Sequence, residues 1–257
     1  SYLCNDGKPI AISPLFKNHA TLPDEMQNRD SRFTQTIFTP DAPWMVEATD
    51  TTWWNEVYEN INTATKFYAP SGYVIRKGYD PVMDFHSLNY EETPSIHYRY
   101  AEVLLNYAEA KAELGEITQD DIDKSIKKLR DRVGMPNLIL NNIDIDPNWD
   151  FPSLSPVINE IRRERRIELA GEGFRWNDMA RWAAADELIV GKRPKGLKGA
   201  QFESNDLYPV DENGFLDPFK ISIPNGYAFD INRDYLNPIP ESEIVLNPNL
   251  KQNPGWK

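Results

Sequence analysis

The chain has 257 residues, with 28 lysines and arginines against 40 aspartates and glutamates, so its formal charge is −12 (28 − 40). This length allows one large domain or two small ones with a sizeable core. No apolar run approaches the roughly 18 to 20 residues of a membrane-spanning helix. A chain this acidic has little to displace counterions from phosphates, so no nucleic-acid partner is expected. The single cysteine excludes an intrachain disulfide framework.

The first 97 residues show no sustained helical period. Prolines interrupt them repeatedly and make up 20 of the 257 residues, about 8% against a usual ~5%. Short β-capable runs occur at residues 33–38 and 73–75. The region 1–97 is therefore predicted to be loop-rich and to lie over a scaffold supplied by other elements.

A helical hairpin is predicted over residues 98–134. Its first helix ends at Gly115, and Thr118 with Asp121 resembles a capping box that opens the second, which Gly134 ends. The predicted buried stripe comprises Ala101, Leu104, Leu105, Ala108 and Ala112, widened by Tyr100, Val103, Tyr107, Ala110 and Leu114. The unit is of tetratricopeptide size, and one repeat cannot bury both of its faces. We therefore expect an absent half of the protein to cover part of the stripe at Ala101, Leu105 and Ala108.

A helix pair is predicted over residues 155–190. Ser155 is a good N-cap and Pro156 suits the first helical position. The first helix should reach the break at 171–173, and the second should run from about 174 to 190. Residues 191–257 read as loops followed by a proline-pinned C-terminal tail.

Two charged segments contain side-chain patterns that could form a chemical site. Aspartates alternate through residues 144–150 like calcium ligands, but Trp149 replaces the required glycine, so a solvated acidic loop is favoured. The segment 160–168 could form an anion site or an acid–base pair, but its i, i+3 spacings favour an ion-pair lattice. In that lattice Glu160 pairs with Arg163, and a partly buried Arg165 is held by Glu168.

No other pattern indicates catalysis. The three histidines are not spaced for a metal, and no phosphate loop, nucleophile elbow or Cys/His pair occurs. A pair of glycosidase carboxylates stays open, because their separation cannot be read from sequence. We expect no catalytic residue, no metal and no cofactor.

Aromatic residues gather in the loop-rich region beside carboxylates and amides. Planar rings stack on the C–H faces of sugars, and carboxylates bond their hydroxyls. The alternative is that most of these rings fill a core. Adjacent residues of an extended stretch point to opposite sides, so one of Trp53 and Trp54 can be buried while the other is exposed. The candidate ligand-binding residues are Trp44, Trp53, Trp54, Tyr58, Tyr68, Tyr73, Asp50 and Glu56.

Four segments together resemble the SusD/RagB family, in that family's order. They are NRDSRF (28–33), RYAEVLLNYAEA (99–110), IRRERRIELAGEGFRWNDMARW (161–182) and LNPIPESEIVLNPNLKQNPGW (236–256). Ser31 and Phe174 depart from the usual proline and histidine of these motifs. Because family members are about twice as long, residues 1–257 resemble their C-terminal half.

The resemblance implies a mainly α, SusD-like fold, in which tetratricopeptide-type helical hairpins carry long loop-rich regions with little β. It also implies a non-enzymatic outer-membrane lipoprotein on the extracellular face. Such a protein captures oligosaccharides or polysaccharides and delivers them to a SusC-like TonB-dependent transporter. It would meet the membrane only through a lipid anchor absent from this chain. The alternatives are a peptide-binding member of the family, a helical-repeat scaffold and a glycoside hydrolase.

Overall fold

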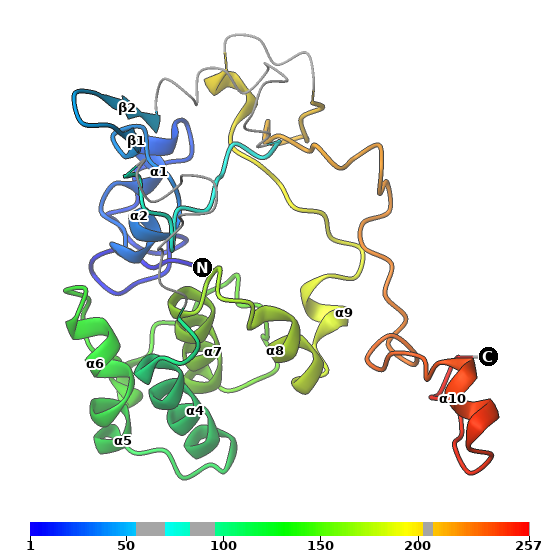
Figure 1. Ribbon diagram of the computed structural model, residues 1–257. Coiled ribbons are helices and arrows are strands. Elements are labelled where there is room, and N and C mark those ends of the chain that lie inside the picture. The colour runs from blue at the N-terminus through cyan, green and yellow to red at the C-terminus, as the bar shows by residue number, and fades with distance from the viewer. Residues whose placement is uncertain (55–69, 83–95, 203–207, 257) are drawn as a thin grey trace. The chain divides into compact units, whose positions relative to one another are not determined.

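A computed structural model describes residues 1–54, 70–82, 96–202 and 208–256. Its fold is mainly α with little β, which confirms the predicted class (Figure 1). The chain forms two compact units, residues 1–173 with 195–218 and residues 174–194 with 219–257. The first unit contains α1 (Leu22–Met26), α2 (Arg32–Thr36), β1 (Pro43–Val46), β2 (Thr51–Trp53), α4 (Tyr100–Glu113), α5 (Gln119–Lys124), α6 (Ile126–Asp131), η2 (Leu140–Asn142), α7 (Pro156–Glu168) and η3 (Gly199–Gln201). The second contains α8 (Arg175–Arg181), α9 (Ala185–Leu188) and α10 (Glu241–Leu246).

The helical body of the first unit is made by α4 to α7. Helix α4 packs mainly against α7 and also against α5 and α6. The Ser155 hydroxyl accepts from the Ile158 amide at the start of α7, and Pro156 is its first residue. The Thr118–Asp121 capping box at the start of α5 is present as predicted. Local end signals in the sequence therefore located these helices correctly.

The buried face of α4 is narrower than predicted. All five residues of the central stripe are buried, with α7 of this same chain as the main neighbour. The expectation that an absent half covers Ala101, Leu105 and Ala108 is therefore wrong. Tyr100, Val103, Tyr107, Ala110 and Leu114, which were predicted to widen this face, are exposed. Glu109, which was not among the predicted buried residues, is buried.

Two predicted helices are interrupted. The second helix of the hairpin breaks at Ser125, whose hydroxyl donates to the Asp121 carbonyl, so α5 and α6 are separate. The predicted helix at 174–190 breaks at Ala183, where φ is +48°, giving α8 and α9. Neither residue is a strong helix breaker, so these breaks come from tertiary context rather than from propensity.

Short elements support the loop-rich region. Residues 33–38 do not form the expected strand, because α2 extends to Thr36. Only the end of the run is extended: Ile37 bridges Ile75, and the Phe38 amide donates to the Val74 carbonyl (2.9 Å). The side chain of Asp30 accepts from the Arg32 amide (3.0 Å), which favours a helical turn at this point.

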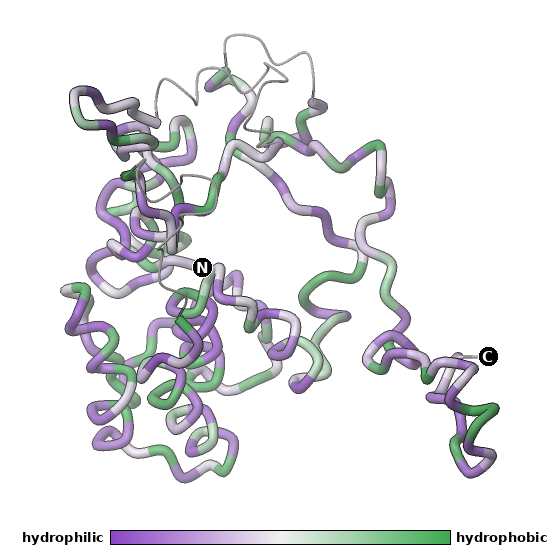
Figure 2. The backbone as a smooth tube through the Cα atoms, viewed as in Figure 1, coloured by the Kyte–Doolittle hydropathy of each residue, from purple (hydrophilic) through white to green (hydrophobic). Residues whose placement is uncertain are grey.

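The second unit is held by aromatic contacts and backbone bonds. Phe229 packs edge-on against Tyr235, whose hydroxyl accepts from the Ala185 amide at the start of α9. Helix α10 leaves Val245 and Leu246 exposed, and its tube in Figure 2 includes both hydrophilic and hydrophobic colours. Among the described helices of both units, none combines the length and the apolar character needed to cross a membrane.

Candidate ligand site

The most exposed aromatic candidate lies on a β-hairpin. Strands β1 and β2 are antiparallel, and Pro43 stands opposite Trp53. Beyond the strand, the Trp54 amide donates to the Ala42 carbonyl (2.8 Å). The turn is closed by a bond from the Glu47 amide to the Asp50 carbonyl (2.9 Å). The register is irregular between Pro43 and Met45, and the hairpin has an inward and an outward face.

The inward face is a small aromatic core. Phe38, Ala42 and Trp54 form its buried centre. Phe38 stacks on Trp54 with 4.7 Å between ring centroids, and the partly buried Trp44 stacks on Tyr79 at 5.1 Å. The Tyr79 hydroxyl donates to the Trp44 carbonyl (2.6 Å). These rings fix the hairpin in place, as the core interpretation of the aromatic cluster predicted.

The outward face presents Trp53. Its side chain is 44% exposed, whereas Trp54 is 3% exposed. The two neighbours therefore point to opposite sides, which confirms the prediction from strand alternation. The Trp53 side chain is exposed on a hairpin that its buried neighbour Trp54 anchors, and an exposed indole ring can stack on a flat ligand.

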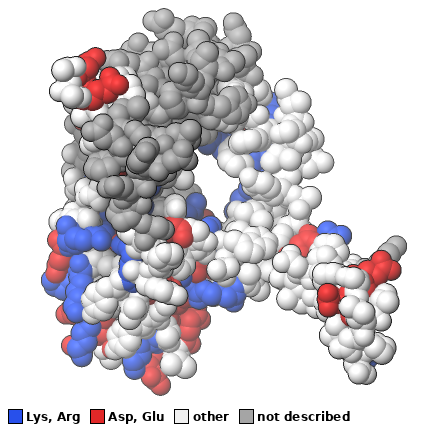
Figure 3. All heavy atoms as spheres, viewed as in Figure 1, with Lys and Arg blue, Asp and Glu red and all other residues white. Residues whose placement is uncertain are grey.

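Exposed carboxylates occupy the turn of this hairpin. Asp50, a predicted candidate, is exposed at the hairpin turn together with Glu47, and acidic side chains stand out at this tip in Figure 3. Asp80 lies next to Tyr79; burial and the Asp80 charge both raise the pKa of the Tyr79 hydroxyl. The sequence prediction did not include Glu47 and Asp80, although their closeness along the chain to Asp50 and Tyr79 could have indicated them.

The other candidates lie elsewhere. The Tyr73 hydroxyl donates to Glu25 (2.7 Å), and its ring packs against the core cluster formed by Leu22, Met26, Phe33 and Leu197. Tyr73 is therefore part of a different cluster from the hairpin aromatics. Tyr58, Tyr68 and Glu56 fall outside the described residues.

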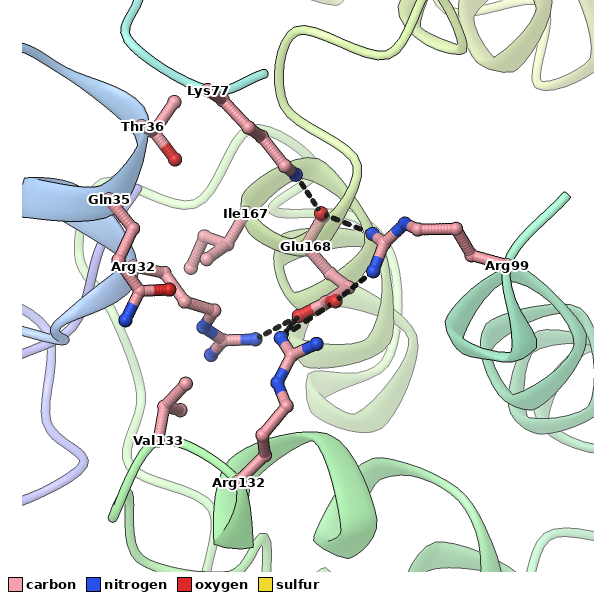
Figure 4. A pocket seen from close by; sticks show the side chains of 9 residues that line it. All are labelled: Arg32, Gln35, Thr36, Lys77, Arg99, Arg132, Val133, Ile167 and Glu168. Atoms are coloured by element: carbon pink, nitrogen blue, oxygen red, sulfur yellow. Dashed lines mark hydrogen bonds and ion pairs between the residues drawn. The ribbon is translucent and has the colours of Figure 1, made fainter. Parts of the chain in front are cut away.

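A second cluster of charged side chains surrounds Glu168 at the end of α7. Figure 4 shows arginines and a lysine converging on this residue around a pocket of about 270 Å³. The Glu168 carboxylate accepts from Arg32 of α2 (3.0 Å), Arg99 at the start of α4 (3.0 Å) and Arg132 at the end of α6 (2.8 Å). Lys77 donates to the Glu168 backbone carbonyl (2.6 Å). We call this group the Glu168 hub.

The hub is continuous with further buried ion pairs. Glu164, one turn earlier on α7, accepts from Arg32 (2.5 Å) and Arg130 (2.9 Å). Burial alone would raise the pKa of the Glu164 carboxyl, but Arg130 and Arg32 more than offset it and hold the pKa below its usual value. Glu172 pairs with Lys77 (2.5 Å) and Arg99 (2.8 Å). Each cation of the hub therefore already has a carboxylate partner.

The predicted ion-pair lattice on α7 is right in kind and wrong in one partner. Glu160 and Arg163 form the expected i, i+3 pair (3.1 Å). Arg165 is buried as expected, but it donates to Asn106 of α4 (2.8 Å), while both Glu168 oxygens are engaged by arginines of other elements. Long-range partners displaced the local one because α2, α4 and α6 all meet the end of α7.

The acidic loop before α7 is part of the same lattice. Asp146 pairs with Arg163 (2.7 Å) and Asp150 with Arg166 (2.8 Å). No group of His, Cys, Asp and Glu in the described ranges could hold a metal ion. These aspartates are ion-pair partners of α7, and Asp146 is buried, so the prediction of a solvated loop is wrong for Asp146.

The hub positions the hairpin. Arg32 belongs to α2, which leads into Phe38, and Lys77 precedes Tyr79 by two residues. Both ends of the aromatic core are thus tied to α7 by buried or half-buried charges. The side chains of the hub pair with one another, which gives the hub a structural role. Exposed aromatic and acidic side chains lie on the hairpin instead.

The family model described as the SusD family matches residues 1–256. The chain belongs to the SusD family. A SusD-like protein of Formosa agariphila is 33% identical over 165 residues, which cover 64% of this chain and 26% of that protein. A second SusD-like protein of that organism is 30% identical over 112 residues, 42% of this chain and 22% of its own length.

Solved SusD-like structures resemble the chain throughout. A SusD-like carbohydrate-binding protein from Bacteroides fragilis is 26% identical with a TM-score of 0.65, covering 97% of this chain and 46% of that one. A second SusD-like protein from the same organism, 23% identical with a TM-score of 0.65, covers 99% and 45% and supports the fold. The SusD-family chain thus spans less than half of these structures and about a quarter of its curated relatives.

Proposed function

We propose that this SusD-family chain is part of a cell-surface protein of the outer membrane that binds oligosaccharides without cleaving them. It passes them to a SusC-like TonB-dependent transporter. Family membership supports this role, and the similar Bacteroides fragilis structure is described as carbohydrate-binding. A lipid anchor would hold the protein at the extracellular face.

The observation that carries the proposal is the outward ring of Trp53. It is 44% exposed on a hairpin whose inner face is fixed by stacked aromatics. An ordered, exposed tryptophan next to carboxylates provides both the stacking surface and the hydroxyl acceptors that sugar binding needs. Trp44 and Trp54 belong to the aromatic core on the other side of the hairpin, and Asp50 is exposed at the hairpin turn. Tyr58, Tyr68 and Glu56 remain candidates on sequence grounds.

The test is titration calorimetry of a glycan panel against the parent protein and Trp53→Ala. Loss of one stacked ring should weaken binding several-fold, on the order of 1 kcal/mol beyond area burial. Trp176→Ala is the matched control, because Trp176 is 49% exposed but lies in the other unit. The proposal predicts that only the Trp53 variant loses affinity. A glycan that binds both variants like the parent would place the site elsewhere.

The same protein preparations also test the alternative functions. If no glycan binds, a peptide panel tests the peptide-binding role, and failure of both favours a helical-repeat scaffold. A reducing-sugar assay on each bound glycan tests hydrolysis. The exposed tryptophan near the carboxylates of the hairpin turn favours a stacked small ligand over the scaffold.

A further inference from the structure

The pairing of the two hairpin strands shifts by one residue. Met45 of β1 pairs with Thr52 of β2. The next pair of a regular antiparallel ladder would join Trp44 to Trp53, but Pro43 stands opposite Trp53 instead. Strand β1 therefore contains one residue more than β2 over this stretch. The extra residue, Trp44, forms a β-bulge.

The bulge decides which of the two adjacent tryptophans faces outward. Residues directly opposite each other in an antiparallel pair have their side chains on the same face. The Trp44 ring lies against the aromatic core, with its centroid 5.2 Å from those of Phe38 and Trp54. In the regular register Trp53 would share this inward face, because a slip of one residue exchanges the two faces. Since the bulge places Trp53 opposite Pro43, its ring is 44% exposed and Trp54 fills the core.

Tyr79 holds the bulge from a neighbouring segment. Its ring stacks on the Trp44 ring with 5.1 Å between centroids and 13° between planes, and its hydroxyl donates to the Trp44 carbonyl (2.6 Å). One residue therefore contacts both the side chain and the backbone of the bulged position. The same segment also bonds β1 directly, because the Val46 amide donates to the Pro81 carbonyl (2.7 Å). The bulge is thus held by contacts outside the hairpin as well as by strand pairing.

We propose that Tyr79 is a positioning residue for ligand binding, whose hydroxyl holds the bulge at Trp44 and so keeps Trp53 on the outward face. The inference rests on the proposed function, because it concerns the ring on which a sugar would stack. Tyr79 acts through Trp53 and does not touch the ligand. Without the hydroxyl bond, part of the population takes the regular register with Trp53 inward, and the apparent affinity falls with the competent fraction.

The first test removes only the hydroxyl. Tyr79→Phe keeps the ring that stacks on Trp44. In titration calorimetry it should weaken binding of a glycan that the parent binds by about fivefold, which corresponds to about 1 kcal/mol, the usual contribution of one hydrogen bond. Tyr235→Phe is the matched control, because the hydroxyl of the half-buried Tyr235 also bonds a backbone group, but in the other unit. Thermal melts should fall by similar small amounts for both variants, so affinity alone separates them.

A double variant tests whether Tyr79 acts through Trp53. In Trp53→Ala the outward ring is already absent, so adding Tyr79→Phe should weaken binding by less than about a further twofold. A further loss of about fivefold in this background would show that Tyr79 contributes to binding independently of Trp53. That result would overturn the positioning role.

A second measurement needs no ligand. The protein is labelled with fluorinated tryptophan, and Trp53→Phe and Trp54→Phe assign the two fluorine signals. In the parent, a soluble paramagnetic agent should broaden the signal of the exposed Trp53 much more than that of the buried Trp54. In Tyr79→Phe this difference should shrink, because each ring spends part of its time on the other face.

The two measurements keep the outcomes distinct. An unchanged difference between the Trp53 and Trp54 signals in Tyr79→Phe contradicts the inference even when glycans bind, and the proposed function then stands. If the difference shrinks but the parent binds no glycan, Tyr79 does position Trp53 and the proposed function fails. If Tyr79→Phe and Tyr235→Phe weaken glycan binding equally, the effect is not specific to the hairpin and the inference is wrong.

Discussion

The Glu168 hub and the hairpin differ in whether their polar and aromatic side chains are paired and buried or exposed. Around the hub, Glu164 and Glu168 are almost fully buried, and their oxygens are engaged by arginines from α2, α4 and α6. On the hairpin, the side chain of Trp53 is 44% exposed, whereas that of its neighbour Trp54 is buried. A dense cluster of charges is thus structural where its members satisfy one another. A ligand surface is expected where planar and polar groups stay uncovered.

The energetic reason is desolvation. Charges removed from water need partners, and the hub supplies a carboxylate for each described cation that lines its pocket. An exposed ring near carboxylates at the surface does not have this desolvation cost, and its bound water can be replaced by a ligand. The three predictions that follow test this contrast, from the largest expected effect to the smallest.

Removing the buried arginine of the hub should have the largest effect. The Arg32 side chain is 5% exposed and pairs with Asp30, Glu164 and Glu168, so Arg32→Ala leaves buried carboxylates unpaired. Loss of one partner of a buried pair costs about 3–5 kcal/mol of unfolding free energy. Urea denaturation measures it. Glycan affinity per folded molecule should be retained, because the hub does not form the outward face.

Arg132→Ala is the matched control. Arg132 also donates to both oxygens of Glu168, but its side chain is 50% exposed. Water can replace much of what it contributes, so the loss should be about 1 kcal/mol or less. Equal losses for the two variants would mean that burial does not distinguish these arginines, and the structural interpretation of the hub would fail.

The adjacent tryptophans should separate stability from binding. Trp54 is buried against Phe38, so Trp54→Ala should lower the unfolding free energy by about 3 kcal/mol, at the lower end for a buried aromatic because the hairpin core is small. Trp53→Ala should change stability by less than about 0.5 kcal/mol. Thermal melts of both variants check this. A Trp53 variant that melts well below the parent would show that its ring is structural.

Acid should weaken the helical body gradually. Hydrogen bonds from Thr118 and Tyr107 lower the pKa of the Asp121 carboxyl to about 2 from the usual 3.8, and the pKa of Glu164 also lies below its usual 4.5. The unfolded chain therefore takes up these protons at higher pH than the folded chain, so stability is complete above about pH 4.5 and falls from there toward pH 2. Burial raises the pKa of Glu160, which acts in the opposite direction.

The variant Asp121→Asn measures how much the capping box contributes to this loss of stability in acid. The variant should be less stable than the parent at neutral pH, and its melting temperature should fall less between about pH 4 and pH 2, because one titrating group is gone. Asp120→Asn, at the neighbouring exposed position, should leave the slope unchanged. If the melting temperatures of the parent and of Asp121→Asn fall equally over this pH range, Asp121 does not contribute to the loss of stability in acid.

The sequence by itself determined the features that depend on near neighbours. The start of α7 at Ser155, the capping box at Thr118 and the Glu160–Arg163 pair all involve residues three positions apart. The opposite orientations of Trp53 and Trp54 follow from strand alternation. Such patterns are fixed by backbone geometry within one or two turns, and any fold that contains the element keeps them.

Only the tertiary structure decided which candidates share a site. Tyr73 was grouped with the tryptophans by sequence distance, yet it bonds Glu25, 48 positions away, in another cluster. Glu168 was assigned to Arg165, three positions before it, but its carboxylate accepts from Arg32, 136 positions away. A residue can satisfy its charge or bury its ring against any element that the fold brings near. Local spacing predicts that a partner is needed, and the packing of α2, α4 and α6 on α7 determines which residue it is.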